Sequence, residues 1–192
     1  MVLIMEYPQD TIPDWSNLKI IHRNTLPPRS SFFLYNTEDE ALNYDTTKSI
    51  SICLSGPWKF LLAPSPLEAP PDFHSPAFDS SPWQTIQVPS MWQLEPNVKG
   101  KSRGPQYTNV MYPFPVNPPN IPWEGNETGC YLKRFKVPEE LRKGKVRVRF
   151  EGVDSAFTLW VNGVEVGYSQ GSRNPSEFEI GELLRFGGWN TM

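Results

Sequence analysis

The sequence predicts an all-β fold, an antiparallel sandwich of the jelly-roll type that follows a long irregular N-terminal arm. Three observations support this prediction: alternating apolar stretches recur between turn signals, 21 of the 192 residues are proline, and 13% are aromatic. Proline interrupts helices, and several short strands with turns between them are typical of β-sandwiches. We therefore expect little helix and a core rich in aromatic side chains.

An extended arm is expected over residues 1–50. Four prolines interrupt any helix in this segment, and no regular apolar pattern runs through it. We expect the arm to be held in place by its aromatic side chains, and residues 51–192 to form the jelly-roll domain. The aromatic residues concerned are Trp15, Phe32, Phe33 and Tyr35.

A β-hairpin over residues 156–168 is the clearest single element. Apolar and other side chains alternate on both sides of Asn162-Gly163. These two residue types tolerate the positive φ angles of a type I′ turn, which is the strongest short-range signal for a hairpin. The apolar face consists of Phe157, Leu159, Val161, Val164, Val166 and Tyr168.

Shorter strands are expected on the N-terminal side of this hairpin and one after it. They lie at 56–62, 85–88, 130–137, 145–151 and 178–180, and a single helical turn is expected at 181–186. Proline-rich loops fill residues 64–82 and 89–128. A loop as long as the second is usually functional or disordered, and its aromatic residues argue against disorder. The chain ends at Met192 where another strand should start, so we expect the sandwich to lack C-terminal strands.

Charge, cysteines and hydropathy narrow the functional class. The net charge of −3 favours neither nucleic-acid nor membrane binding. No apolar run is long enough to span a membrane, and the first residues lack the features of a signal peptide. Cys53 and Cys130 are expected to be buried free thiols. A cytoplasmic location is expected.

Seven motifs, in order, resemble the β-galactosidase branch of glycoside hydrolase family 2. One is the hairpin with its flanks, residues 152–180, and together the motifs cover most of residues 14–190. Any one of them would be a weak signal, but seven in order with compatible spacing are specific. The other six are Asp14–Asn17, Asn24–Arg29, Gly56–Phe60, Val88–Gln93, Tyr107–Pro113 and Thr128–Tyr131.

The resemblance implies a galactose-binding-like jelly roll, the sugar-binding domain that opens a larger enzyme. In that family immunoglobulin-like domains and a TIM barrel follow, and the barrel carries two glutamates of a retaining mechanism. No residue of this chain matches the barrel motifs, so no catalytic residue is expected here and the isolated chain is expected to be inactive. The resemblance also implies magnesium and sodium in the full-length enzyme, terminal β-galactosides such as lactose as substrates, and a homo-oligomer.

One substrate contact carries over from the family. Its loop asparagine hydrogen-bonds the galactosyl group and the next valine lines the pocket, and these positions match Asn109 and Val110. An amide suits this task because it both donates and accepts hydrogen bonds. Judged on the sequence alone, satisfying backbone groups of its own turn is the commoner role for such an asparagine, and only the resemblance favours the substrate contact.

Other candidate chemistry is weaker. The carboxylates near the hairpin are expected at the surface or in turns, and Arg173 is available to Glu177. His22 and His74 have no neighbours at metal-ligand spacing, so no metal site is predicted in this chain. The seven tryptophans could serve as platforms for sugar rings, although core packing is their commoner use. The carboxylates are Glu151, Asp154, Glu165, Glu177 and Glu179.

Two alternatives to the enzyme-fragment hypothesis remain open. A stand-alone carbohydrate-binding module would use Asn109 and the aromatic residues as a weak sugar-binding surface. A complementing fragment would instead dock its arm and exposed sheet edge onto a separate chain that carries the barrel. Sugar binding by the chain alone would favour the module.

Overall fold

The computed structural model of the chain describes residues 12–192 except 101–103, 106, 108, 110–111 and 113. Within this part the predicted all-β fold is confirmed: ten strands are joined by loops, 3₁₀ turns and one short α-helix, α1 (Glu38–Leu42). The strands are β1 (His22–Arg23), β2 (Gly56–Ala63), β3 (Gln84–Val88), β4 (Thr128–Leu132), β5 (Arg134–Lys136), β6 (Arg147–Phe150), β7 (Ala156–Val161), β8 (Val164–Gln170), β9 (Ser176–Glu179) and β10 (Trp189–Thr191).

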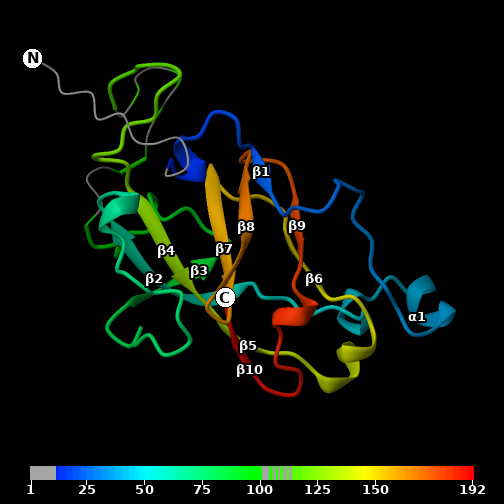
Figure 1. Cartoon of the computed structure of the whole chain (residues 1–192). Helices are drawn as coiled ribbons and strands as arrows, with labels where there is room; N and C mark the ends of the chain where they lie inside the picture. Colours follow the sequence, from blue (N-terminus) through cyan, green and yellow to red (C-terminus); the bar gives the residue numbers. More distant parts are fainter. Residues whose placement is uncertain (1–11, 101–103, 106, 108, 110–111, 113) are drawn as a thin grey trace, which may run out of the picture.

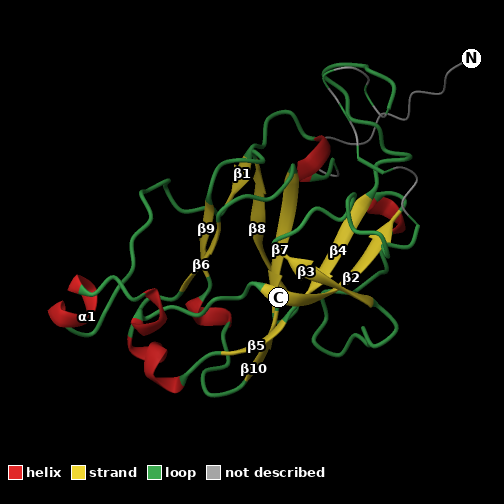
Figure 2. Cartoon of the chain, turned by 180° about the vertical axis from the view of Figure 1, so that it is seen from behind, coloured by secondary structure: helices red, strands yellow, loops and turns green. Residues whose placement is uncertain are grey.

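All strand pairs described in the structure are antiparallel. The sheets have the orders β1-β8-β7, β3-β2-β4, β6-β9 and β10-β5. Figures 1 and 2 show β2, β3 and β4 on one side of the hairpin β7–β8, and β9 and β6 on the other. The core lies between these groups, and its members come from nearly every strand. They include Trp58, Phe60, Ile86, Phe135, Val148, Leu159, Val161, Val166 and Phe178.

The hairpin forms as predicted. Asn162 and Gly163 have φ angles of 51° and 87°, as a type I′ turn requires. Leu159 and Val161 are buried, and an irregularity of register lies between Leu159 and Trp160. The Asn162 side chain also receives the Thr191 N–H at 2.9 Å, so the turn supports the end of the chain.

One predicted strand is in fact two. The alternation over residues 130–137 continues through Lys133, but β4 pairs with β2 and β5 pairs with β10. Lys133 and Met192 exchange backbone hydrogen bonds of 2.9 Å at the change of partner. Side-chain alternation reports which face is buried and carries no information about the neighbouring strand, so the sequence pattern concealed the break.

The arm is fastened to the sheet at several points. Strand β1 pairs with β8, and the Leu26 N–H donates to the Glu177 carbonyl at 2.8 Å. Phe32 and Phe33 are more than half exposed, and the Arg29 guanidinium lies over the Phe32 ring at 4.2 Å from its centroid. The boundary predicted at residues 50 and 51 remains a prediction.

Two predictions about individual side chains were wrong. Cys53 is exposed rather than buried, whereas Cys130 is buried, and both thiols are free. Glu177 is 5% exposed and pairs with Arg29 of the arm, with oxygen–nitrogen distances of 2.5 and 2.8 Å, instead of lying at the surface near Arg173. Its strand β9 is covered by the arm on the face that alternation would leave to solvent, which is why the pattern misled.

Candidate functional site

The long loop between β3 and β4 carries the predicted substrate contact. Asn109 lies exposed in a turn of this loop. Val110, the second predicted contact, lies outside the described residues.

The far end of this loop is tied to the arm by a pair of tryptophans. The rings of Trp15 and Trp123 lie 4.8 Å apart between centroids at an angle of 58°. The Trp123 indole N–H also donates to the Ser16 hydroxyl at 3.1 Å. The 3₁₀ turn η2 (Asp14–Ser16) thus holds the loop and the arm together.

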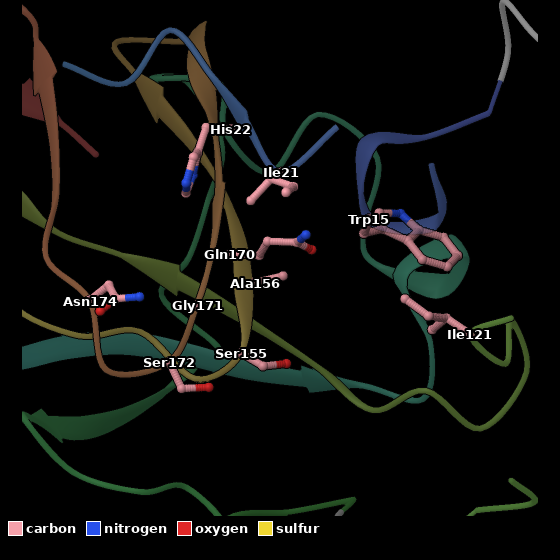
Figure 3. A pocket seen from close by; sticks show the side chains of 10 residues that line it. All are labelled: Trp15, Ile21, His22, Ile121, Ser155, Ala156, Gln170, Gly171, Ser172 and Asn174. Carbon is pink, nitrogen blue, oxygen red and sulfur yellow. The ribbon is translucent and has the colours of Figure 1, made fainter. Parts of the chain in front are cut away.

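A cleft of about 450 Å³ opens beside this junction. Figure 3 shows it between the arm, the ends of β7 and β8, and the turn that follows β8. The arm contributes Trp15 and His22, and the end of β8 contributes Gln170, whose amide is directed toward Trp15 (Figure 3). The other lining residues are Ile21, Ile121, Ser155, Ala156, Gly171, Ser172 and Asn174.

A hydrogen bond from Tyr168 orients the side chain of Gln170. The phenol of Tyr168, which is 1% exposed, donates to the Gln170 side-chain oxygen at 3.1 Å. Burial first, and the charge of Asp14 second, raise the pKa of Tyr168, so the phenol stays protonated and keeps donating. The Gln170 oxygen is therefore occupied, and its NH₂ group is the part that faces the cleft.

His22 belongs to a second chain of hydrogen bonds. Its Nδ1 lies 3.0 Å from the Ser169 hydroxyl, which in turn lies 2.8 Å from the Ser176 hydroxyl. Ser169 is fully buried, so this pair orients the imidazole and cannot present a serine nucleophile to a substrate.

Among the described residues that line the cleft none is Asp, Glu, Lys or Arg, and His22 is the titratable one. The nearest charged group on β1, Arg23, is neutralised by Glu165 and by Asp14, whose carboxylate lies 2.7 Å from the guanidinium. These hydrogen bonds, the one to Glu165 first, raise the pKa of Arg23.

In the described part of the chain no three His, Cys, Asp or Glu side chains come together as metal ligands. No described helix is long and apolar enough to cross a bilayer.

The sequence predicted the loop that carries Asn109, but it did not predict the cleft between the arm and the end of β8. Trp15 was expected to pack the arm. The polar run 172–177 has the polarity of a binding loop, but its composition is more typical of a turn. Gln170 and Asn174 were not singled out, because the cleft exists only once the arm has folded back onto β8. The one signal available was that polar run, which begins where the hairpin alternation stops.

Relatives of the chain are enzymes several times its length. A β-galactosidase of Alteromonas mediterranea is 42% identical over 174 residues, which cover 89% of this chain and 16% of the relative. One of Vibrio cholerae is 41% identical over 175 residues, with 91% and 16% covered. The chain therefore spans only 16% of the length of these curated relatives.

Solved structures show the same fold at low identity. A β-glucuronidase from Ruminococcus gnavus is 17% identical with a TM-score of 0.52, covering 86% of this chain and 22% of that one. A calcium-binding mutant of Bacteroides uniformis β-glucuronidase 2 is 22% identical with a TM-score of 0.51, covering 73% and 14%. The model of the glycosyl hydrolases family 2 sugar binding domain matches residues 52–191. The chain belongs to glycoside hydrolase family 2, and residues 52–191 are its sugar-binding domain.

Proposed function

We propose that this chain is the N-terminal part of a β-galactosidase that hydrolyses terminal β-D-galactosides such as lactose. The observation that carries the proposal is the identity of about 40% to proteins named β-galactosidase, which extends over 91% of this chain. The matched span of 174–175 residues exceeds the sugar-binding domain and so includes much of the arm. On this proposal the chain supplies a substrate contact, and the catalytic carboxylates lie elsewhere in the enzyme.

Asn109 is the proposed contact. Its exposed amide can donate to one sugar hydroxyl and accept from another, which suits recognition of a galactosyl group. Val110 is proposed to line the same pocket. The Trp15–Trp123 contact supports this role, since it anchors the loop to the arm and so limits where the Asn109 turn can lie.

Catalysis is proposed to follow the retaining mechanism. That mechanism needs an acid/base and a nucleophilic carboxylate about 5–5.5 Å apart, and substrate contacts without such a pair do not cleave a glycosidic bond. We therefore propose that the 192-residue chain alone is inactive. Magnesium, sodium, an oligomer and a cytoplasmic location stay proposals for the full-length enzyme, and no step here depends on them.

The test is a chimaera in which this chain replaces the corresponding segment of the Vibrio cholerae relative. Asn109→Ala should lower kcat/KM for p-nitrophenyl β-D-galactoside about tenfold, equivalent to about 1.4 kcal/mol of lost transition-state stabilisation. Asn97→Ala, the same change at another exposed position of the loop, should leave kcat/KM unchanged. Equal kcat/KM for Asn109→Ala and the unsubstituted chimaera would contradict the assignment.

A further inference from the structure

We infer that Asn162 is a site of spontaneous deamidation, which the folded protein keeps closed and which opens when β10 separates from the hairpin β7–β8. Asn162 is the one asparagine of this sequence that a glycine follows. The modification goes beyond the proposed function, because it concerns how long the fold stays intact rather than what the domain binds. It needs no enzyme, so the 192-residue chain can be tested directly.

The reaction is an attack by the main chain on a side chain. The Gly163 nitrogen gives up its proton to hydroxide and bonds to the amide carbon of Asn162, and the side-chain nitrogen leaves as ammonia. Water then opens the cyclic imide at one of its two carbonyls, so an aspartate or an isoaspartate remains at position 162. A following glycine favours the attack, because it has no Cβ in the way and leaves the backbone free to rotate.

The folded chain holds the Asn162 amide by both of its polar atoms. The NH₂ group donates to the Leu183 carbonyl at 2.7 Å and to Asn190 Oδ1 at 2.8 Å. The Asn162 side-chain oxygen accepts the Thr191 N–H at 2.9 Å. Ring closure draws the amide carbon toward the Gly163 nitrogen, and the nitrogen that must leave is the atom that makes two of these bonds. The three hydrogen bonds therefore oppose the reaction as long as they persist.

The partner amide of Asn190 is buried and held in turn. Asn190 is 1% exposed, its oxygen accepts the Arg185 N–H at 2.7 Å, and its NH₂ group donates to the Arg185 carbonyl at 3.0 Å. The Asn162 N–H also donates to the Thr191 carbonyl at 2.8 Å, so main-chain and side-chain bonds both join the turn to β10. Freeing the Asn162 amide thus requires β10 to open locally, and the rate of modification should follow that opening.

The product cannot restore these contacts. A carboxylate has no donor, yet it would face the Leu183 carbonyl and Asn190 Oδ1, which are both acceptors. Turning the Asn190 amide over would not help, because its oxygen is needed by the Arg185 N–H. An isoaspartate would in addition lengthen the main chain of the type I′ turn. Deamidation therefore makes a transient opening of β10 permanent.

The first experiment follows deamidation by mass spectrometry of the peptide that contains Asn162, with the chain kept in mildly alkaline buffer either native or in urea. We expect the native rate to be at least about a hundredfold lower, because reaction in the folded state is limited by the population of the open form. Asn97, which is exposed and precedes a valine, is the internal control and should stay unmodified in both samples. Similar rates for Asn162 in both samples would overturn the inference.

A second experiment tests whether the opening of β10 controls the reaction. Asn190→Ala removes one acceptor of the Asn162 amide and should raise the native rate about tenfold. The unsubstituted chain gives the same information in low concentrations of urea, where deamidation and hydrogen exchange of the Thr191 amide should accelerate in parallel while exchange within β7 stays slow. Deamidation that accelerates only together with exchange in β7 would mean that global unfolding controls it, contrary to the inference.

A third experiment tests the consequence of the modification. Asn162→Asp introduces the acidic product, and Asn162→Gly removes the amide while keeping a residue that tolerates the positive φ. We expect Asn162→Asp to unfold at a lower urea concentration than Asn162→Gly, because only the former places an acceptor against two acceptors. Asn97→Asp adds the same charge at an exposed position and should cause no shift. An Asn162→Asp variant as stable as the unsubstituted chain would contradict the proposed consequence.

Discussion

The hairpin β7–β8 and the N-terminal arm pack against each other through β1, yet they are held in the structure by different means. The hairpin is fixed by repeated burial of alternate side chains, such as Leu159 and Val161. The arm is fixed by individual polar contacts, above all the ion pair of Arg29 with the buried Glu177. Regular burial of alternate side chains therefore forms the domain, whereas a few specific polar pairs fix the arm against it.

The largest expected effect tests whether an aromatic ring contributes more to stability in the buried core than in the arm. Phe178→Ala removes a fully buried ring of the core and should lower the free energy of unfolding by about 4 kcal/mol. Phe33→Ala removes the same ring from the arm, where it is 55% exposed, and should change stability by less than about 0.5 kcal/mol. Urea unfolding followed by tryptophan fluorescence measures both, and similar losses would show that the arm has a buried role of its own.

The second largest expected effect tests whether the ion pair of Glu177 with Arg29 holds the arm. Glu177→Ala leaves the guanidiniums of Arg29 and Arg149 without their buried partner and should cost about 3 kcal/mol. Glu179→Ala, two residues along the same strand, removes only an exposed pair with Lys145 and should cost at most about 0.5 kcal/mol. If the two variants unfold at the same urea concentration, the ion pair does not hold the arm.

Gly167→Ala probes the contact between the two regions without changing any polar group. An added Cβ would lie 2.2 Å from the carbonyl oxygen of Arg23, so β1 must shift away from β8, at a cost of about 2 kcal/mol. Amide hydrogen exchange in β1 should accelerate while exchange in β7 stays slow. At the control position, Gly144→Ala, the new Cβ has open space and should leave both rates unchanged.

The smallest expected effect concerns the reactivity of the two thiols, since Cys130 is buried and Cys53 is exposed. Burial raises the pKa of Cys130 to about 11, so at pH 8 this group remains a protected thiol. Hydrogen bonding from Ser55 lowers the pKa of the exposed Cys53. An aromatic disulfide reagent should therefore modify one thiol in the native protein and both in urea. Rapid modification of both thiols in the native protein would mean that local opening around β4 readily exposes Cys130.

The sequence predicted the elements that are determined by residues close together in the chain. The Asn162-Gly163 turn and the alternation around it determine the hairpin, and the predicted strands at 56–62 and 85–88 correspond to β2 and β3. The loop of Asn109 was located by resemblance, because its exposed residues carry no periodic pattern. What could not be predicted depends on contacts between distant segments. Glu177 is buried by an arm some 150 residues away, and the cleft needs Trp15, Gln170 and Asn174 in one place.

We propose that this chain is the N-terminal part of a β-galactosidase whose catalytic carboxylates lie elsewhere in the enzyme. The most direct measurement compares p-nitrophenyl β-D-galactoside hydrolysis by the isolated chain, by the relative lacking its own N-terminal segment, and by the chimaera that joins the two. We expect no turnover by the isolated chain, and more turnover by the chimaera than by the truncated enzyme. Turnover by the isolated chain, or a chimaera no more active than the truncated relative, would contradict it.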